Sequence, residues 1–190
     1  MIVCDVDNTL ADVNAVLRER FPGNAERESV CHWAPVPEGY FATPGGLDAM
    51  AIALPYPGAA EMLSTLARVE PVYYLTARPT CAAMLTTQWL SRHHFPDGAV
   101  LADCGPVRKA AAAVELGACL GLDDDPQAAW RYRVAGIPCC LYSQPYNARD
   151  FCAFTRWRDL RGVLDAAGCG DLVARAFPRR GWVVGAAPGA

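Results

Sequence analysis

The chain has 190 residues, of which 53% are hydrophobic and 19% are charged, and its formal net charge is −3 at pH 7. These values predict a globular protein of one domain with an insert, or of two small domains, and they exclude a disordered chain. A weakly acidic chain lacks the basic field on which nucleic-acid binding depends. We therefore do not expect a nucleic-acid partner.

The sequence also bears on the cellular compartment. No apolar run reaches the roughly 18 residues that a transmembrane helix needs, and no signal-peptide pattern precedes the first strand. The nine cysteines include no C-x-x-C pair, and several lie in apolar runs, as expected of small buried side chains in a reducing compartment. We therefore expect a cytoplasmic protein without membrane contact, and its oligomeric state is left open.

The first dozen residues predict a buried strand that ends in an acidic loop. The apolar run Ile2, Val3 and Cys4 is followed at once by Asp5 and Asp7. In an open α/β sheet, ligands bind at the carboxyl ends of the strands. An extended chain would point the two carboxylates to opposite faces, so both serve one site only if the chain turns directly after Asp5. On these residues alone, a solvated acidic turn remains the alternative.

The next segment predicts an insert. A helix is expected over residues 14–20, and residues 21–57 are then irregular and rich in proline and glycine. A structureless loop of this length is unusual in a compact domain, so we interpret residues 13–56 as a small, partly helical insert after the first strand. Its aromatic side chains either form a core of their own or face a ligand: Trp33, Tyr40, Phe41 and Tyr56.

From residue 57 the pattern becomes regular. Helices are predicted at residues 57–68, 80–92, 106–116, 126–134 and 158–167, and strands at 71–76, 99–102, 118–122 and 137–142. This alternation predicts an α/β fold with a parallel central sheet and helices on both faces. The predicted division is a core of residues 1–12 and 57–176, an insert of residues 13–56 and a loose tail of residues 177–190.

Polar side chains recur where these strands end. Thr76 follows the second strand, an acidic triplet beginning at Asp123 follows the fourth, and Lys109 begins the helix between the third and fourth strands. Lys109 is the one lysine among 17 basic residues. Two groups of carboxylates can hold Mg²⁺, and Thr76 with nearby backbone N–H groups can bind an oxyanion. Such a site suits a phosphate monoester, whose transfer is catalysed mainly by positioning and charge neutralisation.

These segments also carry a resemblance. Asp5-Val-Asp-Asn-Thr-Leu, Thr76, Lys109 and Leu122-Asp-Asp-Asp-Pro126 resemble, in order, the four motifs of the haloacid dehalogenase (HAD) superfamily. The resemblance spans about residues 2–142 and implies a three-layer, Rossmann-like fold in which the insert is a mobile cap over the substrate. It implies that Asp5 is the nucleophile and forms an aspartyl-phosphate, and that Asp7 protonates the leaving group and then activates water.

The resemblance also implies roles for the remaining site residues. Thr76 and the backbone N–H of Ala77 are expected to hold the phosphate, and Lys109 to neutralise it. Mg²⁺ is expected to bind Asp5, the Asp7 carbonyl and one acid of the triplet, for which we favour Asp124. Asp123 is expected to lie beside these ligands without binding the ion directly. Because dehalogenases of the superfamily lack the second acid, Asp7 favours a phosphatase.

Within the superfamily, the chain is most similar to the 5′(3′)-deoxyribonucleotidase group and its bacterial relatives. The similarity lies in short segments, Leu10-Ala-Asp12, Gly39-Tyr-Phe41, Pro57-Gly-Ala59, Leu75-Thr-Ala-Arg-Pro79 and Gln144-Pro-Tyr-Asn147, whereas Asn8-Thr9 stands where that group often has Gly-Val. It implies a (deoxy)nucleoside monophosphate as substrate. The substrate contacts that we predict are Trp33, Tyr40, Phe41 and Arg78.

Two alternatives stay open. The chain can be a phosphatase for another small phosphorylated metabolite or for a nucleic-acid terminus, in which case no preference for nucleotides is expected. It can also be a non-catalytic protein that binds a phosphate ligand on the same scaffold, because a fold does not determine a function. The presence of every group that the chemistry needs argues against the second alternative.

Overall fold

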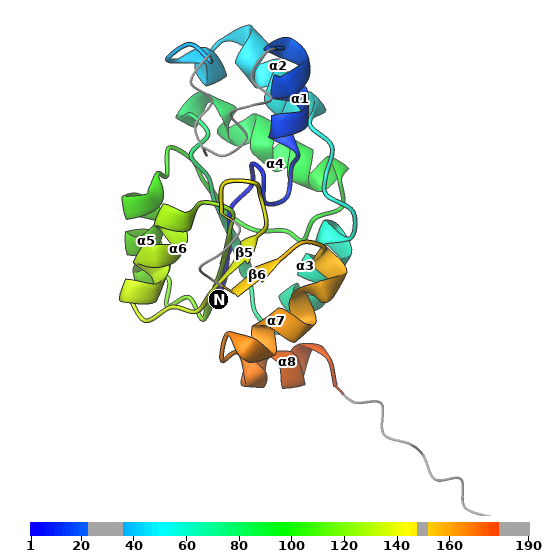
Figure 1. The fold of residues 1–190 in the computed structure, drawn as a ribbon, viewed down its shortest axis with the longest axis vertical. Helices are drawn as coiled ribbons and strands as arrows, with labels where there is room; N and C mark the ends of the chain where they lie inside the picture. Colours follow the sequence, from blue (N-terminus) through cyan, green and yellow to red (C-terminus); the bar gives the residue numbers. More distant parts are fainter. Residues whose placement is uncertain (23–35, 148–151, 179–190) are drawn as a thin grey trace, which may run out of the picture.

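The computed structural model describes residues 1–22, 36–147 and 152–178. Its described part contains one sheet of six parallel strands in the order β3-β2-β1-β4-β5-β6 (Figure 1). The strands are β1 (Ile2–Cys4), β2 (Val72–Leu75), β3 (Val100–Leu101), β4 (Leu120–Asp123), β5 (Cys139–Tyr142) and β6 (Cys152–Phe154). The α/β fold with a parallel central sheet, predicted from the alternating pattern, is confirmed.

Helices connect most of these strands. They are α1 (Val13–Arg20), α2 (Pro44–Ile52), α3 (Ala59–Ala67), α4 (Ala83–Arg92), α5 (Pro106–Glu115), α6 (Pro126–Val134), α7 (Leu160–Ala166) and α8 (Gly170–Ala176). Short 3₁₀ turns lie at Tyr40–Ala42, Thr80–Ala82 and Trp157–Asp159. No described helix has the combination of length and apolar character that spanning a membrane requires.

Three elements were missed by the sequence patterns. Strand β6 consists of the three residues Cys152–Phe154. Helix α2 begins with Pro44-Gly-Gly, which resembles a loop, but Thr43 caps it by accepting a hydrogen bond from the Gly46 N–H, and proline is well tolerated in a first turn. Helix α8 is a short helix between the last predicted helix and the tail.

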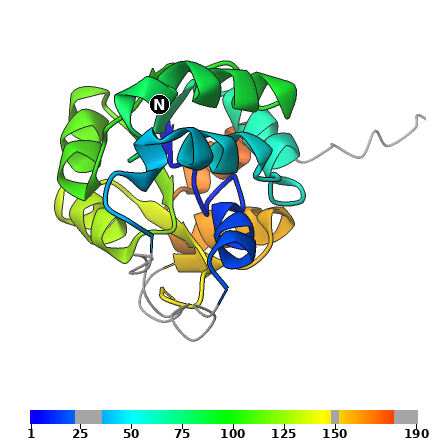
Figure 2. The same ribbon diagram turned by 90° about the horizontal axis from the view of Figure 1, so that it is seen from above.

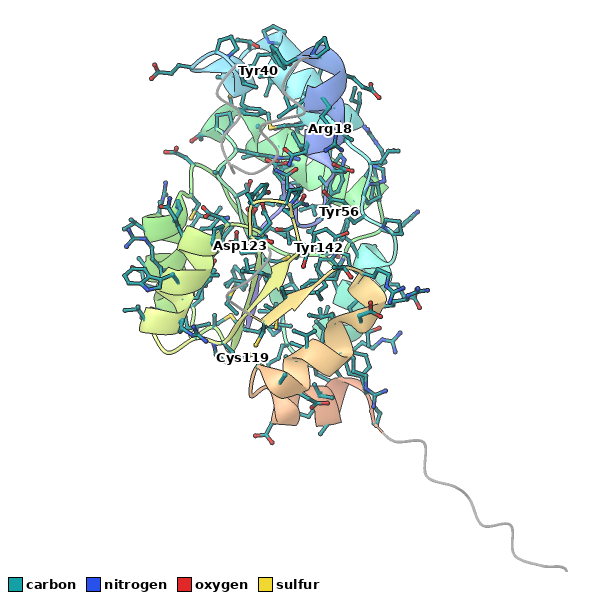
Figure 3. All side chains as sticks on the ribbon, in the orientation of Figure 1. Arg18, Tyr40, Tyr56, Cys119, Asp123 and Tyr142 are labelled. Carbon is teal, nitrogen blue, oxygen red and sulfur yellow. The ribbon has the colours of Figure 1, made fainter. Side chains whose placement is uncertain are left out.

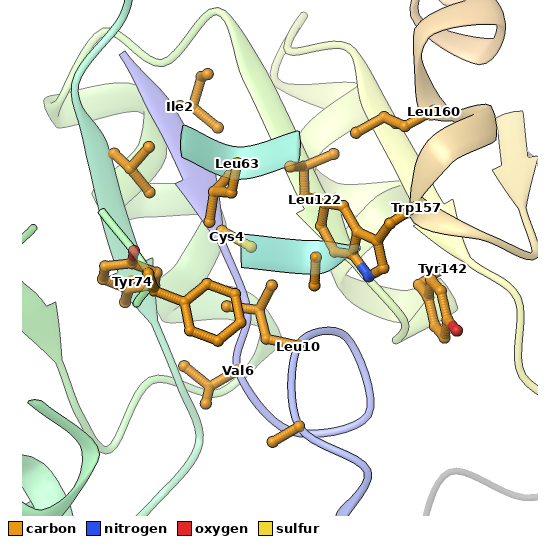
Figure 4. Close-up of a cluster of buried hydrophobic side chains, with 14 of the residues drawn as sticks. Ile2, Cys4, Val6, Leu10, Leu63, Tyr74, Leu122, Tyr142, Trp157 and Leu160 are labelled. Atoms are coloured by element: carbon orange, nitrogen blue, oxygen red, sulfur yellow. The ribbon is translucent and has the colours of Figure 1, made fainter. Parts of the chain in front are cut away.

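The sheet is buried on both faces. Along β1, Ile2 and Cys4 join a cluster that includes side chains of α3, α4, α7 and α8, whereas Val3 joins a cluster formed with α5 and α6. This alternation is the two-residue period of a strand. Figure 2 shows the helices around the sheet, and Figure 4 shows the first cluster, in which Trp157 and Leu160 reach toward Leu122.

The order of the strands determines where a ligand can bind. The connection from β1 to β2 carries α3 on one face, and the connection from β3 to β4 carries α5 on the other face. The neighbouring strands β1 and β4 therefore lie where the winding reverses, and the crevice outside their carboxyl ends is the usual binding site of such sheets. Asp123 is the last residue of β4, and Asp5 directly follows β1.

The insert lies over this same edge. In Figure 1, α1 and α2 lie together at the end of the molecule opposite α8. The two connections between insert and core run side by side, because the Asp12 N–H donates to Leu54 O at 2.9 Å and the Tyr56 N–H donates to Leu10 O at 2.8 Å. The Trp89 indole N–H of α4 donates to Ala53 O at 2.8 Å and fastens the end of α2 to the core.

Candidate active site

The chain turns directly after β1. Asn8 has a φ of 58°, a left-handed conformation that asparagine adopts more readily than most residues. Its side-chain oxygen accepts a hydrogen bond from the Asn14 N–H at 3.0 Å and so links the turn to the start of α1. The Leu10 N–H donates to Val6 O at 2.8 Å and closes the turn. As a result, Asp5 and Asp7 both line one cavity.

Three carboxylates converge at the switch between β1 and β4. Asp5, Asp123 and Asp124 each offer an oxygen, and these oxygens lie within 4.8 Å of one another. All three side chains are buried. Lys109 reaches them from the first turn of α5, with Nζ 2.9 Å from Asp5 Oδ1 and 2.9 Å from Asp123 Oδ2. The structure thus brings together the acids and the lone lysine that the sequence singled out.

Asp123 and Asp124 are held in different ways. Asp123 receives Lys109 on Oδ2, and its Oδ1 accepts the backbone N–H groups of Asp124 and Asp125 at 3.1 and 3.0 Å. Asp124 accepts hydrogen bonds from two neutral hydroxyls, Thr9 Oγ1 at 2.9 Å and the Tyr146 phenol. Asp123 is therefore occupied by a charged partner and by the backbone, whereas Asp124 has no ion-pair partner among the described residues and keeps free lone pairs.

Burial and mutual repulsion perturb the titration of this cluster. Burial raises the pKa of Asp5 and raises that of Asp123 to about 7, although Lys109 opposes both shifts. Burial, together with the charges of Asp5 and Asp123, raises the pKa of Asp124 well above its ordinary value. Burial alone would lower the pKa of Lys109, but the charges of Asp123 and Asp5 outweigh it and raise that pKa.

The three buried acids are short of positive charge, because the ammonium group of Lys109 pairs with only two of them, Asp5 and Asp123. Their donor atoms are all carboxylate oxygens, the ligands that Mg²⁺ prefers, and a divalent cation among them would favour their charged forms. The donor set therefore fits a hard divalent cation.

The segment after β2 forms the next part of the cavity wall. Thr76 is fully buried, and its Oγ1 accepts the Arg78 N–H at 3.2 Å. Ala77 lines the cavity directly beside it. The role of Thr76 and Ala77 in holding a phosphate stays a prediction.

The guanidinium of Arg78 donates hydrogen bonds to both oxygens of the Asp7 carboxylate. Its Nε lies 2.9 and 3.1 Å from the two Asp7 oxygens, and Nη2 lies 2.6 Å from Oδ1. The third nitrogen, Nη1, donates to Thr86 Oγ1 at 3.1 Å, and the guanidinium lies over the Trp89 ring. Arg78 lines the cavity, but its hydrogen bonds orient Asp7; substrate contact by Arg78 stays a prediction. The sequence carried no sign of this pair, because 71 residues separate its members.

The cavity has a volume of about 390 Å³ and two unlike walls. The wall from the sheet edge carries the acids, Lys109 and Arg78, and the wall from the insert is largely apolar. The lining residues of the insert are Val13, Asn14, Leu17, Val36, Pro37, Glu38, Gly39, Phe41 and Met50.

The three predicted aromatic contacts are placed differently. Phe41 lines the cavity. Tyr40 is not among the described lining residues; its ring packs edge-on against Phe21 at 5.2 Å and against Phe41 at 5.5 Å, and its hydroxyl accepts a hydrogen bond from Arg20. Figure 3 shows Tyr40 in the insert, far above Asp123. Trp33 lies outside the described residues.

The loop after β5 contributes partners that the sequence analysis did not predict as site residues. Tyr146 donates to the Asp124 carboxylate, and the Asn147 side-chain amide donates to the Asp124 carbonyl at 2.6 Å. In the sequence, the segment Gln144–Asn147 contributes only to the resemblance to the deoxyribonucleotidase group. A polar loop at the end of a strand that neighbours β4 is the signal that could have linked it to the acids.

Comparison with known proteins identifies the class of this fold. No protein-family model matches the chain, and no curated protein matches it. Solved structures do match it, at identities below 20%. A haloacid dehalogenase-like protein of unknown function from Agrobacterium tumefaciens superposes with a TM-score of 0.58 at 15% identity, covering 88% of this chain and 98% of its own.

A HAD family hydrolase from Deinococcus radiodurans, solved with bound phosphate and sodium, has a TM-score of 0.57 at 18% identity and covers 88% of this chain and 96% of its own. The L-2-haloacid dehalogenase from Xanthobacter autotrophicus has a TM-score of 0.53 at 16% identity and covers 87% and 98%. The chain therefore has the fold of HAD-superfamily hydrolases, with a buried cluster of three aspartates at its switch point.

Proposed function

We propose that this protein is a Mg²⁺-dependent phosphomonoesterase that works through an aspartyl-phosphate on Asp5 and acts on (deoxy)nucleoside monophosphates as a 5′(3′)-nucleotidase. The observation that carries the proposal is the convergence of Asp5, Asp124 and Lys109 in one cavity that also contains Asp7. It joins a nucleophile, a cation site and a second acid at the place where this fold binds ligands.

The side chains divide the chemistry between them. Asp5 attacks phosphorus, and the bond to the ester oxygen breaks as Asp7 donates a proton to the leaving alcohol. Asp7, now a carboxylate, takes a proton from the water that hydrolyses the aspartyl-phosphate and releases inorganic phosphate. Arg78 orients the Asp7 carboxyl through hydrogen bonds to its oxygens, and Lys109 neutralises charge beside the attacking group.

The Mg²⁺ would be held by the carboxylates of Asp5 and Asp124 and by the Asp7 carbonyl. When bound, it supplies positive charge to the phosphoryl oxygens. Asp123, which Lys109 and two backbone N–H groups occupy, would orient the lysine and the loop. The choice of Asp124 over Asp123 as metal ligand agrees with their partners, because Lys109 pairs with Asp123 whereas neutral hydroxyls hold Asp124.

Asp7 supports a phosphatase over a dehalogenase. The superfamily resemblance implies that dehalogenases lack this second acid, and a leaving alcohol needs a proton that a leaving halide does not need. The phosphate bound by the Deinococcus radiodurans protein is in keeping with this choice.

The nucleotide preference is supported by the insert wall. The apolar surface around Phe41 faces the acidic edge across a cavity of about 390 Å³, and a flat aromatic ring suits a nucleobase. Another small phosphorylated metabolite with an apolar group remains the second candidate, because the same wall would accept it.

The test is phosphate release from a panel of ribo- and deoxyribonucleoside monophosphates and an aryl phosphate, with Mg²⁺ and with chelator. We expect chelator-sensitive release that favours the deoxynucleotides. Release without nucleotide preference would retain the phosphatase and discard the nucleotidase. No release from any substrate would favour the non-catalytic phosphate-binding protein.

A further inference from the structure

The loop after β5 closes over Asp124 from one side. The Tyr146 hydroxyl donates to Asp124 Oδ2. Asn147, which is buried, donates from its amide to the Asp124 carbonyl at 2.6 Å and to the Tyr142 carbonyl at 2.8 Å. One short loop therefore holds both the side chain and the backbone of this acid.

The other Asp124 oxygen is held from the opposite side. Thr9 Oγ1, in the loop after β1, donates to Asp124 Oδ1 at 2.9 Å. In the sheet, β1 and β5 are the two neighbours of β4. The carboxylate thus lies between two hydroxyls supplied by the loops that follow the two flanking strands. Each neutral hydroxyl uses one lone pair and leaves the charge available to a cation.

The loop that presents Tyr146 is itself fixed. The Gln144 side-chain amide donates to the Asn8 carbonyl at 2.8 Å and to the Tyr56 hydroxyl at 2.8 Å. The Gln144 N–H donates to the Asn147 side-chain oxygen, also at 2.8 Å. Tyr146 therefore extends from a loop tied to both connections between the insert and the core, which limits the positions that its hydroxyl can take.

We propose that Tyr146 is a positioning residue of the metal centre, whose hydroxyl holds the Asp124 carboxylate in the orientation that binds Mg²⁺. The inference rests on the proposed function, in which Asp124 is a metal ligand. A carboxylate fixed before the cation arrives loses little freedom on binding, whereas a free one must be ordered first. Hydrogen-bond partners of metal ligands are typically worth about 10- to 100-fold in metal affinity.

The experiment measures Mg²⁺ affinity without substrate. Isothermal titration calorimetry of the full chain with MgCl₂ is compared for the wild type, Tyr146→Phe, Tyr142→Phe and Asp124→Asn. Tyr142→Phe is the matched control, because it deletes the same hydroxyl at the end of β5, where no hydrogen bond between the described residues joins that hydroxyl to the acids. We expect Tyr146→Phe to bind Mg²⁺ about 10- to 100-fold more weakly, Tyr142→Phe to bind as the wild type, and Asp124→Asn to lose binding.

Other outcomes overturn the inference in separable ways. Equal or tighter Mg²⁺ binding by Tyr146→Phe, with Asp124→Asn still defective, would refute the role of Tyr146 alone. A wild type that binds no Mg²⁺, or an Asp124→Asn variant that binds it normally, would refute the metal centre itself. Melting temperatures in chelator report whether each variant folds. Should Tyr146→Phe fail to fold, 4-aminophenylalanine at position 146, which keeps an N–H donor, is expected to bind Mg²⁺ within a few-fold of the wild type, and a loss of binding there would refute the inference.

Discussion

The two walls of the cavity are built on different principles. At the sheet edge, the carboxylates of Asp5, Asp7 and Asp124 each have charged or hydrogen-bonded partners supplied by other elements. The insert faces them with a largely apolar surface. The polar contacts within the insert, such as those of Arg20 with Asp48 and with the Gly45 carbonyl, join α1 to α2 and do not involve the acids. Under the proposed function, this difference assigns the reaction chemistry to the core and the choice of substrate to the insert. The following predictions test that division, beginning with the largest effect.

Asp5→Asn should abolish turnover, because the amide cannot form the aspartyl-phosphate. The fold should remain, since the change removes one charge from a crowded acidic cluster and leaves the side-chain shape unchanged. Phosphate release and the melting temperature measure the two effects. Activity near that of the wild type would contradict the covalent mechanism.

Lys109→Arg should lower kcat/KM by about 10²-fold or more, the usual cost of losing one preorganised charged donor. The buried site holds a compact ammonium at 2.9 Å from two carboxylates, and a larger planar guanidinium does not fit the same position. Steady-state kinetics on the best substrate of the panel provide the measurement. A change below 2-fold would show that any cation suffices there.

Arg78→Lys should lower kcat by up to about 10²-fold, within the range assigned to general acid–base catalysis, and should change the pH dependence of kcat. A lysine cannot hold both oxygens of Asp7 or keep the contact with Thr86. Arg108→Lys is the matched control, because Arg108 is exposed and 3.7 Å from Asp103. An altered KM with an unchanged pH profile would instead favour the predicted contact of Arg78 with substrate.

Phe41→Ala should raise KM for nucleotides by about 2- to 10-fold and leave kcat nearly unchanged, since an aromatic contact contributes about 0.5–1.5 kcal/mol. Phe41 lines the cavity from the insert, whereas Asp5, Asp7 and Lys109 line it from the core. Met84→Ala, at an exposed methionine of α4, is the control. A large fall in kcat would contradict the assignment of substrate choice alone to the insert wall.

The smallest predicted effect concerns stability and pH. In the folded state the pKa of Asp123 is raised from 3.8 to about 7, so without metal its contribution to stability is fully present below pH 4 and is lost as the pH rises to about 7. Each pH unit costs at most about 1.4 kcal/mol for this proton, or about 3–6 °C in melting temperature. Bound Mg²⁺ favours the charged carboxylates, so the increase in melting temperature caused by Mg²⁺ should grow from pH 5 to pH 8. Thermal scans with Mg²⁺ and with chelator measure it, and an increase that does not depend on pH would contradict the coupling between the acids and the cation.

Much of this molecule can be predicted from local patterns. The alternation of apolar strands and amphipathic helices determines the parallel α/β sheet, because each pattern reports which side of an element is buried. The acids after the first and fourth strands, Thr76 and the lone Lys109 could be placed at one sheet edge because the carboxyl ends of parallel strands share an edge. Helix α2 was not predicted, because its first turn, Pro44-Gly-Gly, resembles a loop.

The partnerships of the site required the tertiary structure. Nothing local links Arg78 to Asp7, Tyr146 to Asp124 or Thr9 to Asp124, and each pair is separated by between 22 and 115 residues along the chain. The structure alone shows that Asp123 is occupied by Lys109 whereas Asp124 is held by hydroxyls, although the two acids are adjacent in the chain. It also shows that Phe41 lines the cavity whereas Tyr40 packs within the insert. A sequence specifies which side chains carry charge or apolar surface, but the direction in which each one points depends on how distant strands and loops pack around it.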